Sequence, residues 1–489
     1  MRKRSYELPE RLDETERRNT GAFYTPPDIV DFMVALLLKN RSAASLRICD
    51  FSCGAGAFLA GVLRYVRRYA PGDYEVCCKN LWGIDINPEA LALARRELPE
   101  IPAENFICAD TLALDTASLP AFDIIIGNPP YRCGGVKNNP GFSPGQLKIL
   151  KEAFPNSFEY KMNLFALFIE KAAAMAGETA LIVPDSLLCG RYFSKLRRFL
   201  TENFFIKGLF LVEKPAFDAA PGNGVILHFV RTSPPETPSL RTSYFLPGTV
   251  SAEKSFHLLD QRRFMKESRC RFQLTFSFEE EKIIGKLLAV PDRLKDHFRF
   301  ASGLIGKQGK RSIIAAGPGE NCVPGIVFGR EIRPFEICSE GFYLKIAPEL
   351  IKSGLNHERF ASEKVFLRQT GSSLIAAVSK EPLYALNNCH VGTPLDDFPA
   401  ETLAALLNST VMNYLYRYLS GERNRNFAQI DIDLLNTLPL LRNKAFDRFA
   451  ARCAAEKEMR AALDTACAGL FGLTASELEE IRQSMTQGS

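Results

Sequence analysis

Residues 46–69, LRICDFSCGAGAFLAGVLRYVRRY, contain three successive patterns that indicate the class of fold. The apolar run 46–51 predicts a short buried strand, and residues 57–69 place apolar side chains at helical spacing. Between them, Gly54 and Gly56 allow a tight turn in which the backbone approaches a ligand closely. The stretch therefore predicts a strand, a turn and a helix whose free N–H groups face the end of the strand.

The same alternation of short apolar runs and amphipathic stretches continues to about residue 230. Strands that alternate with helices predict an α/β fold with a doubly wound, mostly parallel sheet. In such sheets ligands bind at the carboxyl ends of the strands. The further strands are predicted at 81–86, 105–110, 122–128, 179–184, 205–212 and 225–230, and the further helices at 26–39, 88–98, 163–176 and 192–203.

The pattern changes after RTSPPETPSL (231–240), whose three prolines predict the exit from a domain. Beyond it, strand-like runs such as 325–332 and 364–371 are mixed with a helix-like stretch at 402–419. We therefore predict a second, mixed α+β domain. The predicted boundaries are an N-terminal extension at 1–19, the α/β domain at 20–240, the second domain at 241–440 and a C-terminal helical segment at 441–489.

Composition narrows the class of protein. The chain has 489 residues, of which 46% are hydrophobic and 24% are charged, so a largely disordered chain is excluded. The net charge of +5 allows a polyanionic partner without requiring one. Thirteen cysteines without a C-x-x-C motif and only five histidines argue against a zinc site, so we expect no metal. Because the sequence shows neither a secretory signal nor an apolar run of about 18 residues, we expect a cytoplasmic protein without a membrane span.

Three acidic residues follow the predicted strands and are candidates for holding a cofactor. Asp50 precedes the glycine turn, where a carboxylate fits a positive amino or sulfonium group better than a pyrophosphate. Asp85 ends the next strand, where an acid can accept hydrogen bonds from ribose hydroxyls. Its alternative role is to cap the following helix, although Asn87 also suits that role. Asp110 either accepts a hydrogen bond from an adenine amino group or shapes a turn.

The turn GNPPY (127–131) carries the most specific chemical signal in the chain. Pro129 and Pro130 fix the backbone and remove two N–H donors. The Asn128 side-chain oxygen and the Pro129 carbonyl are then two rigid acceptors that can hold an –NH₂ group, and Tyr131 can stack on a planar ring. The alternative is a Pro-Pro turn with a structural role only.

These motifs and their order resemble those of the N6-adenine DNA methyltransferases with gamma-class motif order. The resemblance implies a Rossmann-like methyltransferase sheet, S-adenosylmethionine as the cofactor, double-stranded DNA as the substrate, and a place in a restriction–modification system. It begins with TGAFYTPPDIVDFM (20–33), DFSCGAGAF (50–58), GIDIN (83–87) and GNPPY (127–131), and continues with NLFALFIEKA (163–172), ALIVPDSLL (180–188) and KLRRFLTENF (195–204). In that family a specificity domain comes last, which the pieces GLIGKQGK (303–310), GIVFGREIRPFEI (325–337), KVFLRQTG (364–371), LLNSTVMNYLYR (406–417) and RNFAQIDIDLLNTLPL (425–440) resemble.

The resemblance also implies roles for individual residues. Asn128 and Pro129 would hold the target amino group on the turn that Pro130 fixes, while Tyr131 and Phe217 would sandwich a target base flipped out of the duplex. The sequence departs from the family at Phe51, where many relatives have proline, and at Thr111, where they often have an aromatic residue. The implied cofactor site has Tyr24, Thr25 and Pro26 near the methionine part, Asp50, Cys53, Gly54 and Gly56 as its floor, Asp85 on the ribose, Asp110 on the adenine amino group, and Ile86 and Phe168 flanking the adenine.

Contacts with DNA are expected at basic side chains of the second domain. Each could meet a phosphate or a base edge, and the alternative is a solvated charged loop. The Gly-, Asn- and Pro-rich loop 132–145 is expected to be mobile and to close over DNA, the alternative being a plain surface loop. The basic candidates are Lys307, Lys310, Arg311, Arg423 and Arg425.

Three other interpretations stay open at this point. The asparagine turn can hold any planar –NH₂ group, so a protein-glutamine or RNA methyltransferase is the main alternative. The second alternative is an N4-cytosine methyltransferase. The third is a DNA-binding subunit that has lost its catalytic activity. No nuclease segment is recognisable, so we expect modification without cleavage, by a monomer; a separate restriction endonuclease is a partner by family analogy alone.

Overall fold

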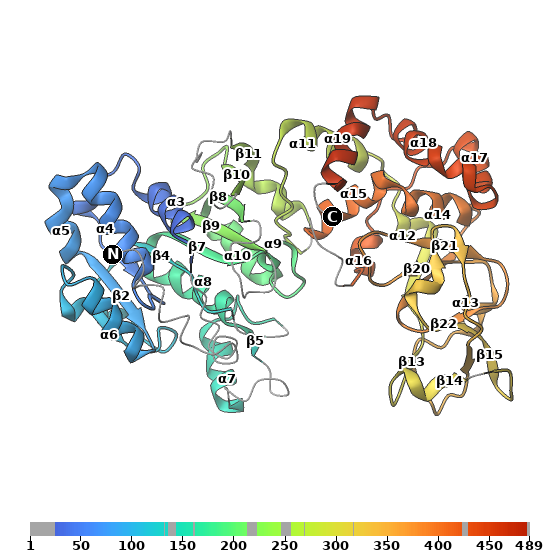
Figure 1. Cartoon of the computed structure of the whole chain (residues 1–489), viewed down its shortest axis with the longest axis horizontal. Coiled ribbons are helices and arrows are strands. Elements are labelled where there is room, and N and C mark those ends of the chain that lie inside the picture. The colour runs from blue at the N-terminus through green and yellow to red at the C-terminus, as the bar shows by residue number, and fades with distance from the viewer. Residues whose placement is uncertain are drawn as a thin grey trace. The chain divides into compact units, whose positions relative to one another are not determined.

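The computed structural model describes residues 25–131, 133–134, 143–159, 162–212, 223–245, 256–267, 269–315, 317–422 and 429–486. The chain divides into two compact units, Met1–Phe276 and Ser277–Ser489 (Figure 1). None of the helices in these described ranges is long and apolar enough to cross a membrane.

The first unit is built on one sheet. In its described part, nine strands are hydrogen-bonded in the order β11-β10-β8-β9-β7-β4-β1-β2-β3. All neighbours from β7 to β3 are parallel, and β9 and β11 run antiparallel to their neighbours. The predicted doubly wound, mostly parallel sheet is therefore confirmed. The strands are β1 Ile48–Asp50, β2 Leu81–Asp85, β3 Phe106–Cys108, β4 Phe122–Gly127, β7 Ala176–Pro184, β8 Phe205–Val212, β9 Gly224–Val230, β10 Ser239–Phe245 and β11 His257–Asp260.

Helices cover both faces of this sheet because its central strands are apolar on both sides. In β4, Ile124 and Ile126 face one hydrophobic core and Ile125 faces the other. Alternation of side chains along a strand produces this division. The first core includes α3 (Pro27–Leu38), α4 (Ala57–Tyr69), α5 (Tyr74–Lys79) and α6 (Pro88–Glu97), and the second includes α8 (Leu164–Met175), α9 (Ser186–Cys189) and α10 (Ser194–Asn203).

Helix α3 is attached to the sheet at both of its ends. Next to its first turn, Thr25 accepts a hydrogen bond from Asn128, which directly follows β4. Beyond its last turn, Arg41 binds the buried carboxylate of Glu178 near the start of β7, with 2.5 Å between Nη1 and Oε2. Glu178 also binds Lys207 and His228. The helix thus connects the amino-terminal part of β7 with the carboxyl-terminal edge of the sheet.

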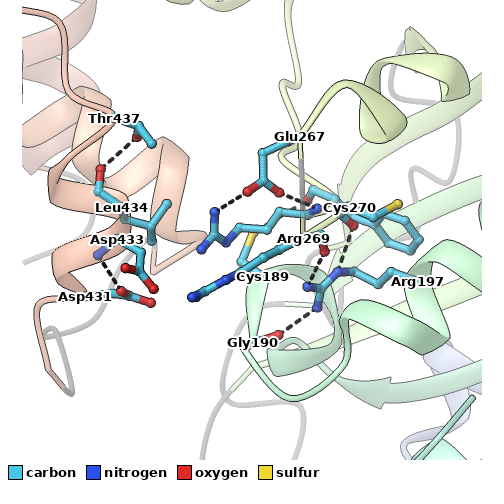
Figure 2. Close-up of polar contacts among 12 residues, drawn as sticks. Cys189, Gly190, Arg197, Glu267, Arg269, Cys270, Asp431, Asp433, Leu434 and Thr437 are labelled. Carbon is cyan, nitrogen blue, oxygen red and sulfur yellow. Dashed lines mark hydrogen bonds and ion pairs between the residues drawn. The ribbon is translucent and has the colours of Figure 1, made fainter. Parts of the chain in front are cut away.

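The first unit extends beyond the predicted exit at 231–240. Strand β10 begins at Ser239, directly after these prolines, and pairs with β8, and its Leu240, Thr242 and Phe245 side chains are buried. Further along, the fully buried Arg197 donates hydrogen bonds to the carbonyls of Cys270, Arg269 and Gly190 (Figure 2). The boundary therefore lies at Phe276 and not near residue 240.

A short insertion follows the predicted asparagine turn. Strand β5 (Cys133–Gly134) pairs with β6 (Met162–Asn163), and between them α7 (Pro144–Ala153) projects near β5 (Figure 1). Ser143 and Gln146 form a capping box that starts α7. Residues 132 and 135–142, on which the prediction of a mobile loop mainly depends, lie outside the described residues.

The second unit combines small sheets with helices, as predicted. In its described part, one sheet has the order β12-β23-β20-β21 and another the order β14-β18-β15-β22. Strand β20 joins two cores, since Val365 and Leu367 face one and Phe366 faces the other. The strands are β12 Phe298–Ser302, β13 Ile305–Gly306, β14 Ile314–Ala315, β15 Cys322–Ile326, β16 Ile332–Arg333, β17 Glu336–Ile337, β18 Tyr343–Lys345, β19 Ile351–Ser353, β20 Lys364–Arg368, β21 Ala376–Ser379, β22 Tyr384–Ala385 and β23 Cys389–Pro394.

Two predictions for this unit are corrected. The helix predicted at 402–419 is two helices, because Ser409 ends one and caps the next by accepting a hydrogen bond from the Met412 N–H. The segment 441–489 is not separate, since its helices bury Phe446 and Ile481 in the core that α14 and α15 share. The helices are α11 Phe278–Leu288, α12 Leu294–His297, α13 His357–Ala361, α14 Ala400–Asn408, α15 Thr410–Ser420, α16 Ile432–Leu435, α17 Lys444–Ala455, α18 Leu463–Leu470 and α19 Ala475–Thr486.

Candidate functional site

The candidate site lies at the carboxyl edge of the parallel strands, where β1, β2 and β4 end. Asp50 is the last residue of β1 and is 1% exposed. A Cβ atom on Gly127, which ends β4, would lie 2.8 Å from Asp50 Oδ1. Only glycine therefore fits at residue 127, and the absence of a side chain there brings the asparagine turn against the carboxyl group of Asp50.

The turn after β1 has the conformation that its glycines were predicted to allow. Gly54 and Gly56 have φ angles of +51° and +85°, a region that glycine occupies without strain. Gly56 is also the N-cap residue of α4. The side chain of Cys53 is buried in the core against Gly83, so this residue can contribute to the floor of the site mainly through its backbone.

Asp85 joins this turn to the end of β2. Its Oδ2 accepts a hydrogen bond from the Gly54 N–H and its Oδ1 accepts one from the Asn87 N–H, each over 2.8 Å. Asn87, in turn, caps α6 by accepting from Glu89 and Ala90. The sequence alternative in which Asp85 itself caps the helix is therefore wrong, and its carboxylate instead connects two loops of the site.

The environment shifts the ionisation of both carboxyl groups. The pKa of Asp50 is raised to about 8, mainly by burial and also by the charge of Asp85, against the hydrogen bond from the Ser52 N–H, which lowers it. Burial also raises the pKa of Asp85, against the hydrogen bonds from Asn87 and Gly54. Among the described side chains, no lysine, arginine or histidine forms an ion pair with either carboxyl group. The pair is thus suited to a ligand that brings its own positive charge.

The asparagine turn meets the TPP motif. Asn128 Nδ2 donates a hydrogen bond to Thr25 Oγ1 over 3.0 Å, and Thr25 is 4% exposed. The adjacent Pro26 begins α3, where its carbonyl accepts from the Ile29 and Val30 N–H groups. An amide whose nitrogen is bound in this way turns its oxygen in another direction, so Thr25 decides which edge Asn128 presents.

Two further contacts fix the turn, and neither of them was anticipated from the sequence. Ser52 Oγ donates to the Asn128 carbonyl over 3.3 Å and so links the glycine turn to the asparagine turn. The Tyr131 hydroxyl donates to the Ile182 carbonyl in β7 over 3.0 Å. Pro129 between them is buried and Pro130 is half-buried. A serine two residues after a strand-end aspartate is the only sequence signal that could have indicated the role of Ser52.

Of the three residues predicted around the adenine, Ile86 and Asp110 follow strands β2 and β3, and Phe168 is buried in the core. Ile86 is 68% exposed at the end of β2, and Asp110 is exposed and accepts a hydrogen bond from the Leu112 N–H. Phe168 is buried in α8 with its ring edge-on to Phe51, at 5.1 Å between centroids. Asp110 thus shapes the turn after β3, as its alternative role predicted, and its carboxylate can also bind an amino group.

Thr111, one of the two departures from the family pattern, makes a specific contact. Its hydroxyl donates to the Phe51 carbonyl over 2.6 Å, and the residue is 3% exposed. The loop after β3 is thereby attached to the turn after β1. An aromatic side chain at residue 111 could not make this hydrogen bond, so here the departure has a structural purpose.

Several predicted residues cannot be placed at the site. Tyr24, Phe217, Arg423 and Arg425 lie outside the described residues. The three remaining basic candidates belong to the second unit and are exposed there: Lys307, Lys310 and Arg311.

Comparisons with known proteins indicate the family to which the chain belongs. Residues 6–281 match the model of the N-6 DNA Methylase family, and residues 325–440 match that of the TaqI-like C-terminal specificity domain. The type II methyltransferase M.TthHB8I of Thermus thermophilus is 30% identical over 216 residues, which are 43% of this chain and 45% of that protein. The ribosomal RNA small subunit methyltransferase C of Shewanella loihica is 39% identical over 101 residues, which are 20% of this chain and 25% of that protein.

These matches have limited extent. The chain spans less than half the length of each of these two relatives. A solved structure, the type IIL restriction-modification enzyme MmeI in complex with DNA, has the same fold over 98% of this chain and 80% of its own, with a TM-score of 0.59 and 14% identity. The family model covers more than half of the chain and includes the glycine turn, both carboxylates and the asparagine turn. The chain therefore belongs to the N-6 DNA methylase family.

Proposed function

We propose that this protein transfers a methyl group from S-adenosylmethionine to the N6 amino group of adenine in double-stranded DNA, as the modification enzyme of a restriction–modification system. The first unit is the methyltransferase domain and the second recognises the DNA target. The enzyme acts as a monomer in the cytoplasm, and a separate endonuclease is its partner in the system.

The contact between Asn128 and Thr25 carries the proposal. It brings the asparagine turn together with the segment before α3, beside the buried carboxyl group of Asp50 and the half-buried one of Asp85. Because the amide nitrogen is held by Thr25, the amide offers its oxygen to an incoming amino group. The rigid Pro129 carbonyl is the second acceptor.

The residues present fit S-adenosylmethionine. A buried acid whose pKa is raised to about 8 is stabilised by a nearby positive charge, which the amino and sulfonium groups of this cofactor provide. Asp50 and the glycine turn would hold the methionine part, Asp85 the ribose and Asp110 the adenine amino group, with Ile86 covering the ring. When bound, the cofactor supplies a methyl group on a positively charged sulfur, which is already a good leaving group.

The side chains of the turn would prepare the target amine. The lone pair of an exocyclic amine is delocalised into the ring, so the nitrogen is a weak nucleophile. Two hydrogen bonds, to the Asn128 oxygen and the Pro129 carbonyl, favour a pyramidal nitrogen and orient its lone pair. This is catalysis by positioning and charge placement. Tyr131, anchored through its hydroxyl to Ile182, offers a fixed ring on which a flipped base can stack.

DNA is favoured over the other substrates by the second unit. Its residues 325–440 match a specificity domain, and MmeI, which shares the fold, is seen in complex with DNA. RNA is the second candidate, favoured by the 101-residue match to a ribosomal RNA methyltransferase. That match covers 20% of the chain and so leaves most of it, including at least part of the second unit, unexplained.

The experiment that tests the substrate class uses the purified full chain and methyl-labelled S-adenosylmethionine. Mixed-sequence duplex DNA, ribosomal RNA and a mixture of glutamine-containing proteins are offered in parallel and then digested to nucleosides or amino acids. We expect label in N6-methyldeoxyadenosine. Label found only in RNA, in protein or in N4-methylcytosine would contradict the proposal.

A further inference from the structure

Two cations converge on one aromatic ring in the second unit. Phe328 lies two residues after the end of β15. The Arg330 guanidinium carbon lies 4.2 Å from the centroid of the Phe328 ring. The Lys310 ammonium lies 5.4 Å from the same centroid, although it is a distant neighbour in the sequence. Both cations are exposed. Contacts of this kind hold a cation in place while it remains open to solvent.

Within the described part of the chain, the guanidinium of Arg330 is hydrogen-bonded along a single edge. Its Nε donates to Glu340 Oε1 over 2.7 Å and its Nη2 donates to Glu340 Oε2 over 2.8 Å. This side-on contact uses the Nε–Nη2 edge. The Nη1 atom takes no part in this contact, so the Nη1–Nη2 edge retains donors on both nitrogens, and the Arg330 side chain is 64% exposed. Two parallel donors on that edge have the spacing that binds the O6 and N7 atoms of guanine.

A buried carboxylate fixes the backbone that carries both partners. Glu331 is 1% exposed, and its Oε2 accepts from the Phe328 N–H over 2.7 Å. Its Oε1 accepts from the Glu340 N–H over 3.0 Å. Between these points the chain turns back as the β16–β17 hairpin. Arg330 therefore belongs to a turn whose position is set before any ligand arrives, as a recognition group requires.

We propose that Arg330 reads a guanine of the target sequence in the major groove, with Phe328 and Glu340 holding its guanidinium in place and Lys310 contacting a nearby phosphate. This inference rests on the proposed function, because it assumes that duplex DNA is the substrate. It adds the residue that determines specificity at one position of the recognition sequence.

The same unit contains a matched control. Arg442 forms an equally close pair with Asp397, but through its Nη1 and Nη2 atoms, over 2.6 and 2.9 Å. Its outer edge is therefore occupied by the carboxylate and cannot meet a base. Both pairs lie at the surface, where solvent screens the charges and an ion pair adds little to folding stability. Substitution of either arginine should leave the fold intact.

The experiment compares the full-length wild type with Arg330→Ala, Glu340→Gln and Arg442→Ala. Each protein is incubated with a library of duplexes of random sequence, and the duplexes that it retains are sequenced. The wild type should enrich one sequence with a fixed guanine. Arg330→Ala should lose the preference at that position alone, by about ten- to a hundredfold, because a bidentate base contact gives discrimination of this order. Glu340→Gln should weaken the same preference, and Arg442→Ala should enrich the wild-type sequence.

The binding selection separates failure of this inference from failure of the proposed function. Retention that falls equally for all sequences in Arg330→Ala would mean that the residue contacts only phosphate, and would overturn the inference. The inference would also be overturned if Arg330→Ala kept the sequence preference of the wild type. It would likewise be overturned if Arg442→Ala lost the preference for the guanine as strongly as Arg330→Ala. If the wild type methylates DNA and Arg330→Ala selects the same sequences as the wild type, the proposed function is retained and only this inference fails.

Discussion

Asn128 Nδ2 lies 3.0 Å from Thr25 Oγ1, and the two residues are 103 positions apart in the chain. The contact joins the turn after β4 to the segment before α3, and α3 is fixed at its other end by the pair of Arg41 and Glu178. The orientation of the amide thus depends on a helix that is attached to the sheet at two distant points.

Replacing Thr25 with valine removes the hydroxyl at nearly constant volume. We expect the rate of methyl transfer at saturating substrates to fall about tenfold, since the loss of one hydrogen bond lets the amide rotate. Cofactor affinity should fall less than the rate, because Thr25 lies beside the expected methionine part but the carboxyl pair is untouched. Steady-state kinetics and a cofactor titration check this, with Thr25→Ser as the control that should restore the rate. An equal loss in Thr25→Ser would show that the hydroxyl is not the cause.

The pKa of about 8 at Asp50 predicts that cofactor binding depends on pH. Below pH 8 the carboxyl group is largely protonated, and a positively charged ligand must displace the proton. Binding at pH 7 should therefore release about one proton. Calorimetry in two buffers with different ionisation enthalpies measures this release. Asp50→Asn should bind the cofactor much more weakly and release no proton from this site; release that persists in the variant would contradict the assignment.

The same residue makes a prediction about stability. The pKa of Asp50 is higher in the folded chain than in the unfolded chain, so the folded state binds more protons and loses stability as pH rises from about 4 to about 8. Asp50→Asn escapes this loss. The cofactor-free variant should melt above the wild type at pH 8, by about 2–4 °C for each kcal/mol gained, and the difference should vanish near pH 4. Thermal melts across this range test the sign.

Thr111→Val tests the contact between the loop after β3 and the turn after β1. In this variant the Phe51 carbonyl loses the hydrogen bond that the buried Thr111 hydroxyl donates. The loop that carries Asp110 is then no longer attached to the floor of the site. We expect a rise of about three- to tenfold in the dissociation constant of the cofactor, with the rate at saturation nearly unchanged. Thr111→Ser should restore the affinity. A variant that loses rate but keeps affinity would refute this role.

Glu178 serves as a stability test away from the site. Its hydrogen bonds with His228 and Lys207 lower its pKa to about 2 despite burial. This stabilisation is present above the unfolded pKa of about 4.3 and is lost as pH falls through about 2. Glu178→Gln should reduce the free energy of unfolding at pH 7 by about 2 kcal/mol, because a buried charge network is broken. The loss stays this small because two partners of Glu178, Arg41 and Lys207, have side chains that are 36% and 35% exposed, so that solvent screens their charges. The difference from wild type should narrow below pH 4, and cofactor affinity per folded molecule should stay the same.

The sequence predicted the first unit well because each motif there is local. A helix at residues 57–69 and a strand at 205–212 were predicted with the observed bounds. The order of motifs also indicated which strand ends would come together. The domain boundary was wrongly predicted at residue 240 because of the prolines in 231–240. The pairing of β10 with β8, which extends the first unit, depends on a strand that lies far back in the chain.

The contacts between motifs were harder to predict. The hydrogen bond from Ser52 to the Asn128 carbonyl, and the links of Asp85 to Gly54 and Asn87, join residues whose proximity only the folded sheet creates. The break at Ser409 was missed because the apolar periodicity of 402–419 continues across the cap. In the second unit, short strands such as β14 and β16 are set by tertiary pairing rather than by their own sequence.

The role of Asn128 in methyl transfer to adenine is tested by comparing the wild type with Asn128→Ala on the same duplex DNA. Cofactor binding is measured for both proteins, and the methylated nucleosides are then identified by mass. We expect N6-methyldeoxyadenosine from the wild type only, with similar cofactor affinity in both proteins, because Asn128 acts on the target amine. Methylation by Asn128→Ala at the wild-type rate, or a methylated product other than N6-methyldeoxyadenosine, would contradict this role.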